Sequence, residues 1–199
     1  MSSRLQQRPA GFTLIEAMVS MTITALAGAV LLLGVQTSMQ TTTDALEEAQ
    51  AMGMAQQLMD EILSRRYMAT GTTPYNSSLG ASAWEYGSSG RERYNDIDDY
   101  NRYTAQAAED QWGIEMGHGD GAGGYRHPDF RVYSGAFADW KQSVSVYYVD
   151  EDDPSVPLSS GNTSNMRAVE VSIYRETTEG DLLPLAHLRR VVAYVPPPE

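Results

Sequence analysis

Glu16 is a carboxylate at the edge of a long uncharged segment, and its chemistry depends on its partner. Residues 17–35 carry no charge, and the next charged residue after Glu16 is Asp44. Placing a carboxylate deep in a bilayer costs about 2.5–3.5 kcal/mol on insertion scales, so such a group normally pairs with a cation or a hydrogen-bond donor. The alternative is that Glu16 lies at the lipid–water interface and reaches water.

A second group of oxygens occurs in residues 95–101, where Asp96, Asp98 and Asp99 are the calcium candidates because Ca²⁺ prefers hard oxygen ligands from flexible backbone. The spacing is not that of an EF-hand loop, since Asn101 and Ala107 occupy the positions of its glycine and its bidentate glutamate. The alternative is a solvated turn in which Asp and Asn cap backbone amides. We favour the turn and expect no cofactor.

Histidines and nucleophiles give little support for catalysis. His118-x-Asp120 and His127-x-Asp129 could suggest a transition-metal site, but both flank a glycine-rich loop without a fixed ligand spacing, and His187 lies in a predicted strand. The chain has no cysteine, which removes thiol catalysis and zinc–thiolate sites. There is no G-x-S-x-G, P-loop, G-x-G-x-x-G or H-E-x-x-H motif. We therefore expect no catalytic residues and a protein that is not an enzyme.

Tyrosine is unusually common, with 12 residues against 3 phenylalanines. Six of them fall in the irregular middle of the chain: Tyr86, Tyr94, Tyr100, Tyr103, Tyr125 and Tyr133. Tyrosine suits contact surfaces because it combines apolar area with a hydroxyl group. The alternative, which we favour, is that these side chains attach irregular loops to the sheet.

One long helix is predicted for residues 12–66, because no proline occurs between Pro9 and Pro74. Its first part, about residues 12–36, is apolar on all sides and long enough to cross a bilayer, which needs about 20 residues. Its second part is amphipathic. The apolar stripe that we predict there consists of Leu46, Ala49, Met52, Ala55, Met59, Ile62 and Arg66.

The remaining chain divides into a loop-rich region, residues 67–140, and a strand region, residues 141–199. Alternating side chains predict strands around residues 143–148, 169–174 and 185–195, with turn residues between them. One face of this three-stranded antiparallel meander should be buried against the amphipathic half of the helix. The predicted fold class is α+β: a long N-terminal helix packed on a small antiparallel β-sheet domain.

The distribution of charge predicts the direction of membrane insertion. The net charge is −12, yet Arg4 and Arg8 before Gly11 are accompanied by no acidic residue. Under the positive-inside rule, residues 1–11 stay in the cytoplasm and the acidic C-terminal part is translocated. An acidic domain also argues against binding to nucleic acid, whose phosphates attract cations.

The sequence around the start of the helix, Arg8-Pro-Ala-Gly11-Phe12-Thr13-Leu-Ile-Glu16, differs from an ordinary signal peptide because its sharp feature precedes the apolar run. It resembles the prepilin N-terminal motif of type IV pilins and type II secretion pseudopilins. The resemblance covers about the first 35 residues. It implies that a prepilin peptidase removes the basic leader, residues 1–11, by cutting after Gly11, and that the new N-terminus, Phe12, is methylated.

The resemblance also implies an assembly role for Glu16, which falls at the fifth position of the mature chain. Cleavage creates an ammonium group at Phe12, free to pair with Glu16 of a neighbouring subunit and so to set the axial register of the helices. Many major pilins carry a proline in the apolar half of this helix. Here that half contains only Gly28 and Gly34, which leaves local melting of the helix open.

Other processing routes compete with this interpretation. Ala25-Leu26-Ala27 is an A-x-A tripeptide of the kind that an ordinary signal peptidase cuts, but it falls halfway along the apolar run, and the run contains Glu16. An uncut signal anchor is a further possibility. In these cases the protein would be a signal-anchored periplasmic binding module, or an exported enzyme with an unrecognised site.

Weaker similarities favour a minor subunit. Residues 49–63 resemble the A-x-x-L-x-x-E-I pattern of minor pilins and minor pseudopilins, and the last two predicted strands resemble their C-terminal strands. We therefore expect a non-enzymatic, pilin-like subunit of a type IV pilus or type II secretion filament. Its partners would be other pilin or pseudopilin subunits, prepilin peptidase and the inner membrane, which it crosses once with its C-terminal domain in the periplasm.

Overall fold

The computed structural model describes residues 11–196, so the basic leader before Gly11, with Arg4 and Arg8, lies outside the described residues. The chain divides between Leu46 and Glu47 into two compact units. Each unit is described by itself. The first holds most of helix α1, and the second holds the end of that helix, the loops and the sheet.

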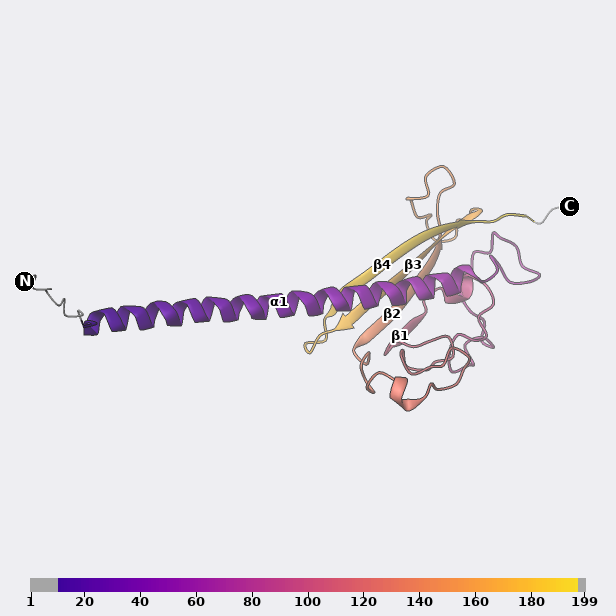
Figure 1. The fold of residues 1–199 in the computed structure, drawn as a ribbon. Helices are drawn as coiled ribbons and strands as arrows, with labels where there is room; N and C mark the ends of the chain where they lie inside the picture. Colours follow the sequence, from indigo (N-terminus) through magenta and orange to yellow (C-terminus); the bar gives the residue numbers. More distant parts are fainter. Residues whose placement is uncertain (1–10, 197–199) are drawn as a thin grey trace, which may run out of the picture. The chain divides into compact units, whose positions relative to one another are not determined.

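Helix α1 spans Leu14–Leu63, a single run of 50 residues (Figure 1). In the first unit its apolar side chains, including Leu26, Leu31 and Leu33, are exposed. The hydroxyl groups of this stretch are turned back onto their own helix: Thr37 donates to the carbonyl of Leu33 at 3.0 Å, and several others repeat this i to i−4 bond. Those others are Ser20, Thr24, Thr41, Thr42 and Thr43. The helix therefore presents an apolar surface with few free polar groups.

The second unit contains an antiparallel sheet of four strands, in the order β1-β2-β3-β4 (Figure 1). The strands are β1 (Thr104–Gln106), β2 (Trp140–Tyr148), β3 (Met166–Glu176) and β4 (Leu182–Ala193). The prediction of an α+β fold with an antiparallel sheet is confirmed, but the predicted three strands are one too few. The short β1 was missed because three residues are too few to show a two-residue alternation.

Alternation along the strands places one side of the sheet in the core. Val144 pairs with Val171 and Val146 with Val169, and all four are buried. The register shifts between Ile173 and Tyr174, and Pro184 of β4 stands opposite Tyr174. Proline lacks an N–H group for the ladder and is found on edge strands and at bulges, which is its place here. Strand β4 begins at Leu182, three residues before the predicted start at residue 185.

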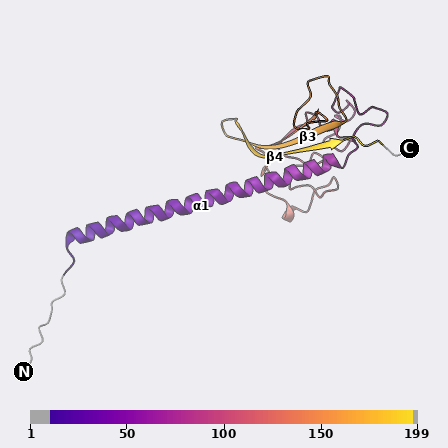
Figure 2. The same ribbon diagram turned by 90° about the horizontal axis from the view of Figure 1, so that it is seen from above.

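The end of α1 covers the buried face of the sheet, and Figures 1 and 2 show this part of the helix alongside β3 and β4. Its buried residues recur at three- and four-residue steps: Ala51, Met54, Ala55, Leu58, Met59 and Ile62. The predicted stripe was partly wrong, because Leu46 and Ala49 are exposed and Met52 is only half-buried. Arg66, its last member, is exposed and lies beyond the end of α1. The true face is centred on Ala51, Met54, Leu58 and Ile62, and small, flexible and branched side chains fill it.

Tyrosines complete the core from the loop-rich region. Tyr94, Tyr100 and Tyr103 are buried in the same cluster as the helix and strand residues. The ring of Tyr94 packs edge-on against that of Tyr100, with centroids 5.0 Å apart, a favoured aromatic geometry. For these three residues the prediction that tyrosines attach loops to the sheet is confirmed. Tyr86, Tyr125 and Tyr133 are instead exposed.

Candidate functional site

The residues just before α1 form a reciprocal helix cap. The backbone N–H of Thr13 donates to Oε2 of Glu16 at 3.3 Å, and the N–H of Glu16 donates to Oγ1 of Thr13 at 3.3 Å. The hydroxyl of Thr13 also donates to Oε2 of Glu16, at 3.2 Å. A Thr followed three residues later by Glu is the capping-box pattern, which satisfies N–H groups that a helix start leaves free. In this conformation Glu16 has donors within its own chain, beside the positive end of the helix dipole.

The surface after this cap is apolar and uncovered. The Phe12 side chain is 76 % exposed, and the side chains from Leu14 to Val35 are exposed with it. Helix α1 is long and apolar enough to cross a membrane, and none of its most apolar window is buried inside the protein. An exposed apolar surface of this size needs lipid or another apolar surface to cover it. The helix therefore fits a single-pass membrane anchor.

A family model, the prokaryotic N-terminal methylation motif, matches residues 7–32. The chain carries a prepilin-type N-terminus. The match includes Gly11, Phe12 and the capping pair Thr13 and Glu16, and it ends within the apolar helix. It confirms the resemblance seen in the sequence and, with the long apolar helix, supports a type IV pilin-like protein processed by prepilin peptidase. Comparisons with curated proteins and with solved structures give no match.

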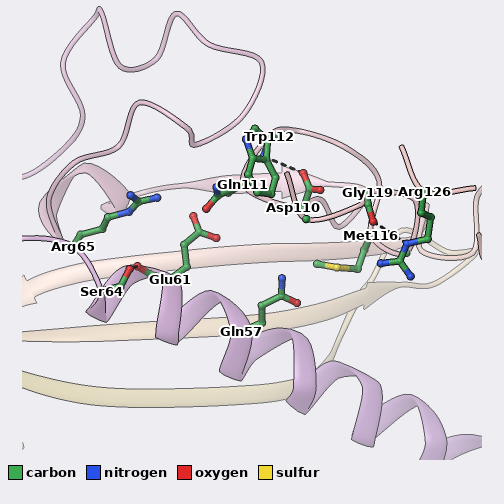
Figure 3. A pocket seen from close by; sticks show the side chains of 12 residues that line it. Gln57, Glu61, Ser64, Arg65, Asp110, Gln111, Trp112, Met116, Gly119 and Arg126 are labelled. Carbon is green, nitrogen blue, oxygen red and sulfur yellow. Dashed lines mark hydrogen bonds between the residues drawn. The ribbon is translucent and has the colours of Figure 1, made fainter. Parts of the chain in front are cut away.

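The match does not reach the second unit, which has two mainly polar hollows at the end of α1. Figure 3 shows one of them, with a volume of about 440 Å³, and its lining comes from the end of α1 and the loop after β1. The carboxylate of Asp110 accepts the backbone N–H groups of Trp112 and Ile114, at 2.9 and 3.0 Å. The guanidinium of Arg126 donates to the carbonyl of Gly119 at 2.8 Å. These charged groups thus order the loop itself.

This hollow lacks the partners that would activate a serine or cysteine nucleophile. Its lining residues include neither histidine nor cysteine, and Ser64, its one hydroxyl side chain, donates to the helix carbonyl of Glu61 at 2.6 Å instead of to a general base. A serine nucleophile needs a base within hydrogen-bond reach. The N-terminal motif, described above, points to a structural pilin-like protein rather than to an enzyme.

A buried ion pair joins α1 to the loop-rich region beside this hollow. Arg91 is only 2 % exposed, and its Nε and Nη2 atoms each donate to one carboxylate oxygen of Glu61, both at 3.0 Å. The hydroxyl of Tyr100 donates to the same carboxylate at 2.8 Å. The hydroxyl of Tyr103 accepts a hydrogen bond from Arg91 and donates one to Glu109. Burial alone would lower the pKa of Arg91, but the bonds to Glu61 hold it above its ordinary value. This two-bonded geometry is the strong form of an arginine–carboxylate pair.

The predicted calcium candidates are turned inward and bonded to the protein. One oxygen of Asp96 accepts the N–H groups of Asp98 and Asp99, and one oxygen of Asp99 accepts those of Asn95 and Asp96. Asp98 pairs with the fully buried Arg167 at 2.9 Å. The capping of backbone amides by Asp96 and Asp99 is as predicted, but the prediction of a solvated turn was wrong, because all three aspartates are buried. Within residues 11–196 no three His, Asp or Glu side chains gather in a way that could hold a metal ion.

Burial changes the acidity of this carboxylate group. It raises the pKa of Asp96 to about 8, with further contributions from a hydrogen bond to Asp98 and from the charges of Asp98 and Asp99. Burial raises the pKa of Asp99 as well. Asp96 therefore holds a proton near neutral pH. Because it is uncharged, its carboxyl group can lie beside that of Asp98 inside the protein.

The histidines have structural partners. The ring of His118 is bonded to the carbonyl of Val132 at 3.1 Å and lies 3.5 Å from Glu115. His127 accepts the N–H of Asp129 at 3.4 Å, and His187 lies 3.0 Å from the hydroxyl of Ser172 on the sheet surface. The structure does not bring His118 and His127 together with a third ligand in the described residues.

Sequence reasoning missed the buried arginines, Arg91 and Arg167, and the capping role of Thr13. The capping box was readable, because Thr13 and Glu16 have the required spacing before an apolar run. Arg91 and Arg167 gave no local signal, because their partners Glu61 and Asp98 lie 30 and 69 residues away. The guanidinium of Arg167 also stacks over the rings of Tyr67 and Tyr148, at 4.4 and 5.1 Å.

Proposed function

We propose that this protein is a minor structural subunit of a membrane-anchored filament, either a type IV pilus or a type II secretion pseudopilus. Prepilin peptidase would cut after Gly11, and Phe12 would become the methylated first residue of the mature chain. The observation that carries the proposal is the matched N-terminal methylation motif, which runs into an exposed apolar helix. The second unit is acidic and rich in loops, which supports a minor subunit that offers a contact surface to other proteins.

The proposed assembly step uses the ammonium group that cleavage creates at Phe12. Glu16 lies four residues further on, in the first turn of α1. In the capped conformation its carboxylate uses Oε2 for Thr13. Its other oxygen can accept the ammonium of a neighbouring subunit without loss of the cap. An ion pair between neighbours would set the axial register, which contacts between apolar side chains in lipid do not select.

The proposed partners and orientation follow from the same segment. Other pilin-like subunits would cover the apolar face of α1, and prepilin peptidase would act on the leader. The two arginines of the leader favour its retention in the cytoplasm, which places the second unit on the periplasmic side of the inner membrane.

The first test is the mass of the mature protein extracted from membranes that contain prepilin peptidase. We expect an N-terminal N-methyl-Phe12. A mature N-terminus at Gly28, or a chain that keeps its leader, would contradict the proposal and favour a signal-anchored binding module.

The second test separates the charge of Glu16 from its cap. Glu16→Gln keeps a side chain that can complete the capping box but has no charge, while Thr13→Val removes the cap hydroxyl and keeps the charge. We expect Glu16→Gln and Glu16→Ala to impair co-purification with partner subunits, with export and cleavage unchanged, and Thr13→Val to have little effect. Glu48→Gln is the matched control, since Glu48 is an exposed acid on the same helix. Normal incorporation of Glu16→Gln would show that Glu16 acts only as a cap.

A further inference from the structure

A second hollow in the second unit, about 540 Å³ in volume, collects positive charge in an acidic protein. Arg65 and Arg66, just after α1, form one wall, and Arg93 and Trp84 from the loop-rich region form the other. The remaining lining residues are Ser64, Glu92, Tyr94 and Asn95. Below, this hollow is called the arginine pocket.

Each guanidinium of the arginine pocket is positioned by a neutral acceptor. The three bonds are Arg65 Nε to the Tyr100 hydroxyl at 3.4 Å, Arg66 Nη1 to Thr70 Oγ1 at 2.6 Å, and Arg93 Nη1 to the Trp84 carbonyl at 2.9 Å. A guanidinium has five N–H donors, so within residues 11–196 most donors of all three have no protein acceptor. No carboxylate of residues 11–196 forms an ion pair with them, whereas Arg91, Arg167, Arg175 and Arg189 are all paired.

The two walls of the pocket are tied together by the backbone. The N–H of Arg66 donates to the carbonyl of Asn95 at 3.4 Å, and the N–H of Ile97 donates to the carbonyl of Arg66 at 2.9 Å. Between them Tyr94 is buried against Tyr100. The arginines are therefore held in place before any ligand arrives, which reduces the entropy that binding would cost.

Trp84 adds a large apolar surface at the rim. Its side chain is 66 % exposed, and the guanidinium of Arg93 lies over its ring at 5.0 Å. Trp and Arg are among the residue types that contribute most of the binding energy at protein–protein interfaces. An inorganic anion would use the arginines and leave the indole uncovered.

Two simpler roles explain only part of this arrangement. Cations at the end of a helix interact favourably with its dipole, which accounts for Arg65 and Arg66 after Leu63. It does not account for Arg93, which comes from another segment. Glu92 lies in the same lining and could neutralise one arginine, yet it forms no ion pair with the described residues. A carboxylate from outside would meet three guanidiniums and one acid.

We propose that the arginine pocket binds an acidic segment of a partner protein, with one or two carboxylates on the guanidiniums and an apolar or aromatic side chain against Trp84. Arginine forks match carboxylates in geometry as well as in charge. A nucleic acid strand is disfavoured because its many phosphates would meet a chain of net charge −12. The site does not depend on filament assembly, so it can be tested on the isolated protein.

The test uses the full chain in a neutral detergent and the peptide acetyl-Ala-Glu-Phe-Glu-Ala-amide as the probe. The indole N–H resonance of Trp84, assigned by its loss in Trp84→Phe, reports binding. We expect a saturable shift that weakens as salt is added, and no shift with the peptide in which Gln replaces both Glu residues. Arg66→Gln and Arg93→Gln should each weaken binding about tenfold, the effect of losing one charge-assisted hydrogen bond.

Two controls separate binding from folding. Arg190→Gln removes an exposed arginine of β4 that has no carboxylate partner in residues 11–196, and it should leave the affinity unchanged. Arg66→Gln should keep the melting temperature, because the Arg66 side chain is exposed. The proposal is overturned if the Glu peptide gives no saturable shift, if the Gln peptide binds equally well, or if Arg190→Gln weakens binding as much as Arg66→Gln. Arginine-dependent binding of a single-stranded oligonucleotide in place of the peptide would also overturn it.

Discussion

Replacing Glu61 with alanine should destabilise the second unit strongly, because it leaves Arg91 buried without a counter-ion. Both side chains lie inside the protein, with Arg91 2 % and Glu61 11 % exposed, and two hydrogen bonds of 3.0 Å join them. Removing one partner of a buried pair costs about 3–5 kcal/mol. The hydroxyl of Tyr100 loses its acceptor in the same change. For a protein of this size, a loss of that order lowers the melting temperature by roughly 10 °C.

The measurement is thermal unfolding of the full chain in detergent, followed by near-ultraviolet circular dichroism, which reports the packing of the second unit's aromatic side chains. Asp60→Ala is the matched control, since Asp60 is the adjacent acid on the same helix and is exposed. Glu61→Leu combined with Arg91→Met should recover most of the stability, because apolar replacement of a whole buried pair is often neutral. If Glu61→Ala unfolds within about 2 °C of Asp60→Ala, the pair contributes no more than a surface ion pair, and the reasoning fails.

Two further predictions concern the carboxylates near residue 96. The folded protein keeps a proton on Asp96 up to about pH 8, while the unfolded chain loses it near its ordinary value of 3.8, so stability should fall as the pH rises between these limits. The slope from one proton is at most about 1.4 kcal/mol per pH unit; Asp96→Asn should flatten it in denaturant unfolding, and an unchanged slope would contradict the assignment. Calcium at 1 mM, followed by chelation, should not move the melting temperature, because Asp96 and Asp99 accept backbone amides and Asp98 holds Arg167. A calcium-dependent shift of several degrees would overturn that expectation.

The parts of the fold that could be predicted from the sequence are those in which apolar side chains recur at a short, regular spacing. Valines alternate in β2 and β3, and apolar residues recur at helical steps in α1, so local pattern was enough. The stripe on α1 was misplaced because Leu46 and Ala49 fit the period equally well. Only the position of the sheet, which begins to cover the helix at about Ala51, distinguishes the two faces.

The loop-rich region could not be predicted, because its order depends on contacts between residues far apart in the sequence. Arg91 looks like any surface arginine until Glu61 is placed beside it, and Arg167 likewise until Asp98 is. Burial of such groups is decided by tertiary structure. The N-terminal site was the opposite case: Gly11, Phe12 and Glu16 lie within six consecutive residues, so the motif itself is a local signal. Their roles in cleavage, methylation and assembly stay predictions.

The hydroxyl groups turned back onto α1 affect how far the helix can move along the membrane normal. Because the hydroxyl groups of Thr37, Thr41, Thr42 and Thr43 already bond to helix carbonyls, these threonines can enter lipid without an unsatisfied donor. The amide side chains of Gln36 and Gln40 add a cost, and the first charge is that of Asp44. The uncharged run before Asp44 is about 40 Å long. That exceeds the hydrocarbon core of about 30 Å, so such an anchor could rest at more than one depth, as the proposed assembly into a filament would require. The chain has no cysteine of its own, so a single cysteine at Thr37 or Thr43 would report that depth by its reaction with a water-soluble thiol reagent; a residue shielded at one fixed level in every state would exclude the movement.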